Sequence, residues 1–257
     1  MPAALVTGVS RLGGIASAVA RTLARDGWTV AGTGFPPYDA TEPWGAERGA
    51  PDRLSEEGAL AAWSEDDLAD PEAPARVVAA AEAAVGPLTA LVVVHTESRP
   101  GGVLDTGAAD FDRHLAVNAR ATLLLVAEFA RRFRGEPGSG RIVAFTTGAV
   151  HGEIAYGASK KALEQLVVAS AVELGPNGIT VNAVDPGPTD TGWLSDELAE
   201  RISEATPLRR IGGPEDAAEL VAFLCSARGG WITGQTLVSD GGLSVAPPLR
   251  RAREPLG

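Results

Sequence analysis

Short apolar runs alternate with segments of helical periodicity along almost the whole chain. The apolar runs lack the alternating polar positions of a half-exposed strand, so they predict strands buried on both faces, as in a parallel sheet covered by helices. The predicted strands comprise residues 3–6, 28–31, 88–94, 141–145, 179–184 and 235–238. The spacing of apolar residues predicts helices over residues 14–26, 75–85, 111–133, 156–174 and 214–225. Repeated strand–helix units of this kind predict a doubly wound α/β fold with a parallel sheet.

Nothing in the chain marks a second domain, because no repeat or low-complexity linker interrupts this alternation. We therefore expect a single domain over residues 1–245. Residues 35–55 contain four prolines and are expected to form a long surface loop, and a second loop is expected over residues 188–213. Residues 246–257 have too little apolar content to fold alone and are expected to be a flexible tail.

The charge of the chain narrows the range of partners. Its 257 residues include 22 Lys and Arg against 33 Asp and Glu, a formal net charge of −11. A surface this acidic repels nucleic acid and anionic lipid, so neither is expected as a partner. The single cysteine, Cys225, cannot form an internal disulfide, and the first residues lack the basic region of a secretion signal. Because the apolar runs are also too short to span a bilayer, we expect a cytoplasmic protein without a membrane partner.

A glycine-rich turn follows the first predicted strand. Residues 7–16 read TGVSRLGGIA and lead directly into a predicted helix. Glycines such as Gly8 and Gly14 permit a tight turn and a close approach of backbone N–H groups to a pyrophosphate, which the positive end of the helix stabilises. An ordinary strand-to-helix turn is the alternative interpretation, but the strand before and the helix after it favour dinucleotide binding.

The kind of dinucleotide is predicted by the residues around the second strand. An NAD site carries an Asp or Glu about 20 residues past the glycines, where it binds the ribose 2′-hydroxyl. Residues 27–37 contain no acidic residue, and Arg11 lies in the glycine turn itself. A guanidinium at that place can pair with a 2′-phosphate. NADP(H) is therefore the favoured cofactor, with an exposed loop arginine as the alternative interpretation of Arg11.

The chemistry is predicted from a tyrosine and a lysine one helical turn apart. Tyr156 and Lys160 share one face of a predicted helix, so the phenol and the ammonium can address the same point. The only other tyrosine is Tyr38, and the only other lysine is Lys161. A neighbouring ammonium and an oxidised nicotinamide ring are expected to lower the pKa of Tyr156, which would make its phenol an effective acid or base.

Together these motifs resemble those of the classical short-chain dehydrogenase/reductase family, and the resemblance covers roughly residues 3–243. It implies a single Rossmann-type domain. The further matching elements, in chain order, are Asp67-Leu68, Asn118 within HLAVNA at 114–119, NAVDPGPT at 182–189, PED at 214–216, ITGQ at 232–235 and DGG at 240–242.

The resemblance also implies a reaction, in which an NADPH-dependent oxidoreductase reduces the carbonyl of a small molecule to an alcohol, or runs in reverse. Tyr156 would donate the proton, and Lys160 would hold the nicotinamide ribose hydroxyls. Asn118 would support a water that joins Lys160 to solvent. Thr147 falls where the family has a serine that polarises the carbonyl, and threonine keeps the hydroxyl donor.

The same resemblance implies the cofactor contacts and an assembly. Asp67 would bond the adenine amino group, and Thr189 would bond the nicotinamide carboxamide. A homotetramer or homodimer is expected, formed through the helices at 111–133 and 156–174. The full set of expected cofactor contacts is Gly8, Ser10, Arg11, Gly14, Ile15, Asp67, Leu68, Tyr156, Lys160, Pro186, Gly187 and Thr189.

The glycine turn departs from the classical family pattern. Five residues separate Gly8 from Gly14, and Ala16 replaces the last glycine. This loop resembles that of the divergent, enoyl-reductase branch of the superfamily. The close spacing of Tyr156 and Lys160 argues against enoyl-reductase chemistry.

A second departure follows the strand at 88–94. The family's Asn-Asn-Ala-Gly is replaced here by the residues VVHT at 93–96. Two interpretations are open. Either His95 or Glu97 compensates for the lost polar groups, or apolar packing fills their place.

The substrate is expected to bind between two variable segments. The segment at residues 148–155 is shorter than the corresponding segment in the family. It includes His151 and Glu153, which are candidates for substrate contact or auxiliary acid–base chemistry. The alternative for His151 is a histidine that is merely solvated in a loop. Trp193 is expected either to form part of an apolar lid over the site or to pack against its own loop. The three histidines have no metal-ligand spacing, so no metal site is expected.

Two other functions stay open beside a carbonyl reductase (ketoreductase). One is a non-redox enzyme of the same fold, such as a dehydratase or isomerase, that uses Tyr156 for proton transfer. The other is a catalytically silent protein that binds the cofactor.

Overall fold

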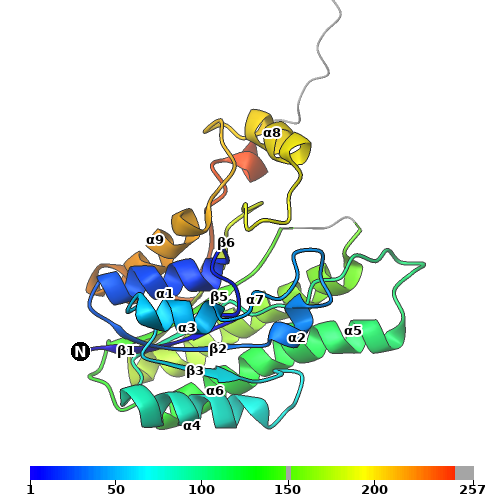
Figure 1. Ribbon diagram of the computed structural model, residues 1–257. Helices are drawn as coiled ribbons and strands as arrows, with labels where there is room; N and C mark the ends of the chain where they lie inside the picture. Colours follow the sequence, from blue (N-terminus) through cyan, green and yellow to red (C-terminus); the bar gives the residue numbers. More distant parts are fainter. Residues whose placement is uncertain (149–151, 247–257) are drawn as a thin grey trace, which may run out of the picture.

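The computed structural model describes residues 1–148 and 152–246 and consists of a parallel sheet between two layers of helices (Figure 1). The seven strands pair in the order β3-β2-β1-β4-β5-β6-β7, and all of these pairings are parallel. The predicted fold, a single doubly wound α/β domain of Rossmann type, is confirmed. The strands are β1 Ala3–Thr7, β2 Thr29–Gly34, β3 Ala62–Glu65, β4 Ala90–Val93, β5 Gly140–Phe145, β6 Ile179–Asp185 and β7 Thr236–Val238.

The helices cover both faces of this sheet (Figure 1). They are α1 Ile15–Arg25, α2 Pro36–Asp39, α3 Ala50–Glu56, α4 Ala73–Val85, α5 Ala108–His114, α6 Ala121–Arg132, α7 Ile154–Leu174, α8 Asp196–Ala205 and α9 Pro214–Cys225, with short 3₁₀ turns η2 Gly175–Asn177, η3 Ala227–Gly229 and η4 Leu243–Val245. Successive residues of a strand point to opposite faces. Leu5 of β1 therefore packs into an apolar cluster with α4, α6 and α7, while Ala4 and Val6 pack into a second cluster with α1 and α9.

Helix α9 has the bounds that the sequence predicts. Pro214 occupies its first turn, where a missing backbone N–H costs nothing. Just before the helix, the backbone N–H of Gly213 donates to the Asp216 carboxylate at 2.8 Å. Local capping signals of this kind explain why the ends of this helix could be located from the sequence alone.

Several segments differ from the sequence prediction. The loop expected over residues 35–55 contains α2 and α3, and the loop expected over 188–213 contains α8. Helix α8 buries none of its residues, although its apolar residues gather on one side and Ser195 caps its first turn by accepting from the backbone N–H of Leu198. Strand β3 has no counterpart among the predicted strands, because it is a short edge strand of partly exposed residues that pairs only with β2.

The long helix expected over residues 111–133 is divided by a π-helical stretch, η1 Leu115–Arg120, between α5 and α6. A π-helical turn holds one more residue than an α-helical turn and occurs frequently at functional sites. Asn118 lies in η1 and is buried, and the hydroxyl of Thr122 donates to its backbone carbonyl at 2.7 Å. The irregular turn therefore sets the position of Asn118.

Residues 247–257, most of the expected tail, lie outside the described residues, so the domain boundary at residue 245 stays a prediction. Among the described residues, no helix combines the length and the apolar character needed to cross a bilayer.

The order of the strands reverses between β1 and β4, which are neighbours although two strands separate them in the sequence. In open α/β sheets, ligands bind outside the carboxyl ends of the strands at such a point. The segments that follow β1, β4, β5 and β6 all emerge at this edge. They carry the glycine turn, residues 94–98, residues 146–148 and residues 186–189.

Candidate active site

A cavity of about 900 Å³ opens at the carboxyl ends of the strands and brings most of the predicted site residues together. Asn118 and Lys160 are buried and do not line its wall. His151 lies outside the described residues. The predicted residues that line the cavity are Gly8, Ser10, Arg11, Gly14, Ile15, Asp67, Leu68, Thr147, Glu153, Tyr156, Pro186, Gly187, Thr189 and Trp193.

The glycine turn forms one wall of this cavity. Gly8 has a φ of +81°, and a β-carbon there would lie 2.8 Å from the backbone nitrogen of His95, so only glycine fits. Gly14 precedes α1, whose N-terminus has no side-chain cap and no acidic residue in its first turn. An uncapped helix N-terminus with two glycines at the wall of a cavity suits the phosphates of a dinucleotide.

Arg11 connects the glycine turn to two other segments. Its guanidinium donates to the carbonyl of Thr191 and lies 4.9 Å from the ring centroid of Trp44. Burial lowers the pKa of Arg11, and the negative charges of Asp39 and Glu47 oppose that effect. Arg11 is therefore not an isolated surface arginine but part of the cavity wall.

The sequence analysis missed the contribution of residues 38–44 to this wall. Tyr38, Asp39 and Trp44 line the cavity, and the Trp44 indole donates to the buried Asp39 carboxylate at 2.9 Å. The available signal was the pair of aromatic residues, Tyr38 and Trp44, in a stretch just after the second strand. Asp39 also places an acidic residue near Arg11, just beyond the acid-free segment that the sequence analysis considered.

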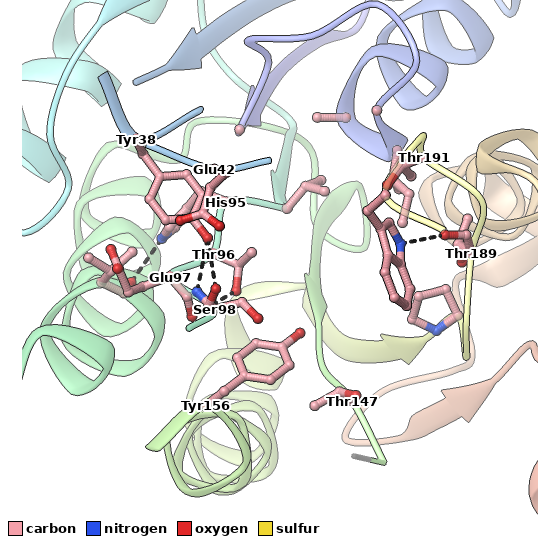
Figure 2. A pocket seen from close by; sticks show the side chains of 18 of the residues that line it. Tyr38, Glu42, His95, Thr96, Glu97, Ser98, Thr147, Tyr156, Thr189 and Thr191 are labelled. Atoms are coloured by element: carbon pink, nitrogen blue, oxygen red, sulfur yellow. Dashed lines mark hydrogen bonds between the residues drawn. The ribbon is translucent and has the colours of Figure 1, made fainter. Parts of the chain in front are cut away.

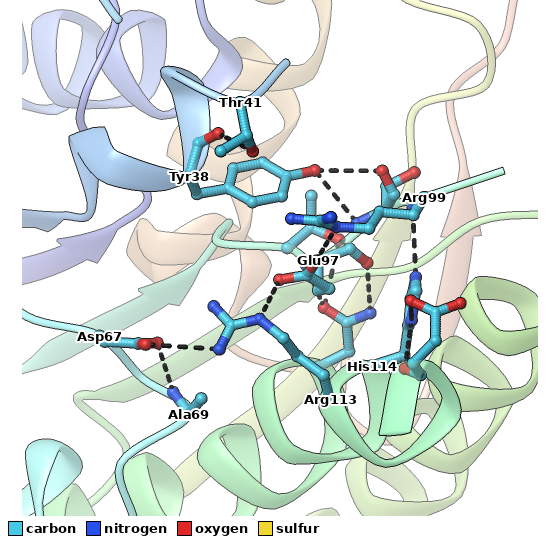
Figure 3. A network of polar contacts seen from close by, with 12 residues as sticks. Tyr38, Thr41, Asp67, Ala69, Glu97, Arg99, Arg113 and His114 are labelled. Atoms are coloured by element: carbon cyan, nitrogen blue, oxygen red, sulfur yellow. Dashed lines mark hydrogen bonds and ion pairs between the residues drawn. The ribbon is translucent and has the colours of Figure 1, made fainter. Parts of the chain in front are cut away.

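An ion-pair network forms the wall next to Asp67 (Figure 3). The carboxylate of Glu97 is buried and accepts hydrogen bonds from Arg99 at 2.8 Å and from Arg113 at 2.9 Å. Arg113 also pairs with Asp67 at 3.4 Å, and the backbone N–H of Ala69 donates to Asp67 at 2.9 Å. The network fixes Asp67 at the end of the cavity where the sequence analysis expects the adenine.

Tyr38 belongs to the same wall and is bonded to the backbone of Ser98. Its hydroxyl donates to the carbonyl of Ser98 at 3.1 Å and accepts from the backbone N–H of Ser98 at 3.2 Å. Burial raises the pKa of Tyr38, so its phenol stays protonated at physiological pH. This tyrosine is tied to the backbone and has no free hydrogen-bonding capacity for acid–base chemistry.

Asn118 holds the segment that follows β4. Its side-chain oxygen accepts from the backbone N–H of Glu97 at 2.8 Å and from the Thr96 hydroxyl at 3.2 Å. Its side-chain nitrogen donates to the carbonyl of Glu97 and to the hydroxyl of Ser159, both at 2.8 Å. Asn118 therefore connects η1, residues 96–97 and α7 through one amide.

Tyr156 projects from the first turns of α7 into the cavity (Figure 2). The side chains of Thr96 and Thr147 hydrogen-bond to it and lower its pKa, but desolvation by burial is the larger effect and raises that pKa to about 12. The negative charges of Glu153 and Asp185 act in the same direction as burial. In the protein without a dinucleotide, burial thus outweighs the neighbouring donors. The expected lowering of the Tyr156 pKa by Lys160 together with a bound nicotinamide stays a prediction.

Lys160 lies one turn after Tyr156 and is buried beneath the cavity. Its ammonium donates to the carbonyl of Phe145 at 2.9 Å and lies 5.8 Å from the ring centroid of Tyr156. Burial lowers the pKa of Lys160 to about 7. Tyr156 and Lys160 thus share one side of α7, as predicted, whereas Lys161 is exposed and pairs with Glu164 at 2.7 Å.

Glu153 and Trp193, the two described residues that the sequence analysis offered for substrate contact, both line the cavity. Burial raises the pKa of the Glu153 carboxyl. The indole of Trp193 donates to the carbonyl of Thr189 at 3.0 Å and is about half exposed. Trp193 is thus bonded to its own loop, the second alternative from the sequence, and also lines the cavity. Its role as part of a lid stays a prediction.

Comparison with known proteins agrees with this geometry. Residues 8–244 match the family model described as enoyl-(acyl carrier protein) reductase. The uncharacterized oxidoreductase YjdA of Bacillus subtilis is 37% identical over 244 residues, which are 93% of this chain and 95% of that protein. A solved short-chain dehydrogenase/reductase from Serratia marcescens is 32% identical with a TM-score of 0.83, over 95% of this chain and 98% of that one.

The chain belongs to the short-chain dehydrogenase/reductase family. It is an oxidoreductase of that family. A second solved family member, from Burkholderia cenocepacia and in complex with NADP, is 34% identical with a TM-score of 0.81, over 95% of this chain and 98% of that one. The predicted likeness of the glycine loop to the divergent branch of the superfamily stays a prediction.

Proposed function

We propose that this short-chain dehydrogenase/reductase is an NADPH-dependent carbonyl reductase that converts a ketone or aldehyde to an alcohol, or the reverse, with Tyr156 as the proton donor. One observation carries the proposal. The glycine turn with the uncapped N-terminus of α1 and the phenol of Tyr156 line the same cavity. Such a cavity can hold a dinucleotide and a small carbonyl compound side by side. The NADP complex of the Burkholderia relative supports the choice of cofactor.

The residues of the cavity fit NADP(H) along its length. Gly8, Ser10, Gly14 and Ile15 would hold the pyrophosphate at the helix N-terminus, and Arg11 would hold the 2′-phosphate. At one end, Asp67 and Leu68 would hold the adenine. At the other end, Pro186, Gly187 and Thr189 would hold the nicotinamide. Lys160 lies behind the cavity wall, so it would hold the nicotinamide ribose only if its ammonium left the carbonyl of Phe145. When bound, the cofactor supplies the hydride that the carbonyl carbon accepts.

The protein supplies the proton and the orientation. With a pKa of about 12, Tyr156 is protonated at neutral pH and can donate to the carbonyl oxygen as negative charge develops there. The Thr147 hydroxyl, beside Tyr156 in the cavity wall, would hold the same oxygen. Asn118 would keep the segment at residues 96–97 in place during the reaction and support a water next to Lys160.

The substrate would enter beside Trp193 and Glu153, which line the same cavity as Tyr156. The proposal also gives His151 a role in substrate contact or as an auxiliary acid or base. The expected homotetramer or homodimer is supported by exposed apolar side chains on α6 and α7, which are Leu123, Val168 and Val172. We also propose that the protein is located in the cytoplasm.

The experiment that tests this function monitors NADPH absorbance with a panel of ketones and aldehydes. We expect consumption of NADPH with equimolar formation of alcohol, and slower consumption of NADH. Product formation without net cofactor turnover would indicate a dehydratase or isomerase. Binding of NADPH without any product would indicate a protein that only binds the cofactor.

The role of Arg11 gives a separate prediction. Arg11→Ala is expected to weaken NADPH binding by about 10- to 100-fold, as for the loss of one charged hydrogen bond, and to weaken NADH binding much less. Binding of both dinucleotides is measured by fluorescence titration. Arg25→Ala, which removes an exposed arginine of α1, is the matched control. An equal loss of both affinities would mean that Arg11 only links the cavity walls.

A further inference from the structure

The segment after β4 carries polar side chains where the family pattern has small residues. His95 and Thr96 occupy the last two positions of the stretch that reads Asn-Asn-Ala-Gly in the family. Both residues line the cavity, and Figure 2 shows them in the wall that also holds Tyr156. The sequence left open whether polar side chains compensate for the lost asparagines or apolar packing fills their place. The hydrogen bonds of His95 and Thr96 favour compensation by polar side chains.

His95 connects the end of β1 with η1. One ring nitrogen, Nδ1, lies 2.7 Å from the Thr7 hydroxyl, and the other, Nε2, lies 3.0 Å from the carbonyl of Val117. Because a carbonyl only accepts, Nε2 carries the hydrogen and Nδ1 accepts from Thr7. Burial, and to a smaller extent the positive charge of Lys160, lower the pKa of His95 to about 3. The imidazole is therefore neutral, and it holds the residue that precedes Asn118.

Thr96 lies between Asn118 and Tyr156. Its hydroxyl donates to the side-chain oxygen of Asn118 at 3.2 Å and lies 3.4 Å from the carbonyl oxygen of Glu97. It shares the cavity wall with the phenol of Tyr156, whose pKa it lowers. A hydroxyl has one hydrogen and can rotate to a different acceptor. The Asn118 oxygen keeps a shorter bond, 2.8 Å from the backbone N–H of Glu97, when Thr96 turns away. The change of partner therefore leaves no buried acceptor without a donor.

We propose that Thr96 is a further catalytic residue, whose hydroxyl turns from Asn118 to the phenolate oxygen as Tyr156 loses its proton, and that His95 is the positioning residue that holds this arrangement through Val117. The proposal rests on the proposed role of Tyr156 as the proton donor. In carbonyl reduction, the proton passes from Tyr156 to the substrate oxygen, and the negative charge left on the phenolate receives the Thr96 hydrogen bond. Thr96 itself transfers no proton.

The first test removes the hydroxyl and keeps the shape of the side chain. Thr96→Val is expected to raise the apparent pKa of alcohol oxidation by about one pH unit and to lower kcat of reduction about tenfold, the effect of one hydrogen bond to a charged group. Thr96→Ser should restore both values. Thr180→Val, at the opposite end of the sheet in β6, is the control for the substitution itself. A pH profile unchanged in Thr96→Val, with a reduced melting temperature only, would overturn the proposal.

The second test does not depend on turnover. The chain has two tyrosines, so protein labelled with 3-fluorotyrosine gives two ¹⁹F signals, and Tyr38→Phe identifies the signal of Tyr156. Titration of the ligand-free protein should show a higher pKa for Tyr156 in Thr96→Val than in Thr96→Ser or the unmodified chain. An equal pKa in all three would refute the role of Thr96. A shifted pKa in a protein that reduces no carbonyl compound would support Thr96 and reject the proposed function instead.

His95 is tested by the same titration. His95→Leu removes both ring hydrogen bonds and is expected to raise the pKa of Tyr156, because Thr96 loses its fixed position. His95→Gln can still donate to the carbonyl of Val117 and should restore most of the pKa. A fall in melting temperature for both variants, with no change in the Tyr156 pKa, would limit His95 to a structural role.

Discussion

Replacing Tyr156 with phenylalanine is expected to lower kcat for carbonyl reduction by about 10²- to 10⁴-fold, the usual contribution of a positioned general acid. Only the hydroxyl oxygen is lost, and the ring remains in the wall of the cavity. The affinity for NADPH should therefore change little. Turnover is measured by NADPH consumption, and affinity is measured by fluorescence titration.

Tyr38→Phe is the matched control for this prediction, because it removes the only other phenol of the chain. Tyr38 hydrogen-bonds to the backbone of Ser98 and not to a reacting group, so kcat should stay within a few-fold of the original value. Loss of cofactor affinity together with turnover in Tyr156→Phe would show that the phenol holds the dinucleotide. Unchanged turnover would exclude Tyr156 as the proton donor.

The buried ammonium of Lys160 is expected to make the stability of the ligand-free protein depend on pH. The pKa of Lys160 falls from its ordinary value of 10.5 to about 7 in the folded protein. Below pH 7 both states carry the charge, and the folded state bears the full cost of burying it. Between pH 7 and pH 10.5, Lys160 is neutral in the folded state and still protonated in the unfolded state. The free energy of unfolding therefore rises with pH in this range.

Lys160→Met removes this contribution while keeping an unbranched apolar side chain of similar length. Relative to this variant, the free energy of unfolding of the unmodified chain should rise by about 3 kcal/mol between about pH 6.5 and about pH 9.5. Urea unfolding at both pH values measures the difference. Lys161→Met removes an exposed lysine at the next position and should leave the rise intact. Parallel stability curves for Lys160→Met and the unmodified chain would show that Lys160 is charged in the folded state.

The architecture could be predicted where local signals and burial agree. Strands such as β1 and β4 are apolar on both faces, and α9 has a proline and an aspartate in its first turn. Strand β3 could not be predicted in this way, because it is short and buries too little to impose a pattern on its residues. Helix α8 carries a serine cap, two acidic residues in its first turn and an apolar side, signals that the prediction of a loop there did not use. The π-helical turn at η1 depends on tertiary contacts, such as the bond from His95 to Val117, that local sequence does not contain.

The residues of the site also fall into those that the sequence could reveal and those that it could not. The sequence identified Tyr156, the glycine turn and most of the cavity wall, because these residues follow strand ends at fixed spacing. It did not reveal the ion pairs of Glu97, which join residues distant in the chain. The effect of burial on the pKa of Tyr156 was also beyond its reach. Desolvation depends on how closely the surrounding segments pack, and residue spacing carries no such information.

The hydrogen bonds of Asn118 to the backbone of residue 97 have a consequence for sequence change at the neighbouring positions. Two of its four side-chain bonds go to the backbone of Glu97, and a backbone group is the same whatever side chain is attached to it. Mutations at neighbouring positions can therefore accumulate without changing the course of the loop. The family's Asn-Asn-Ala-Gly and the residues Val-Val-His-Thr at 93–96 can therefore both precede a loop held at residue 97 in the same way.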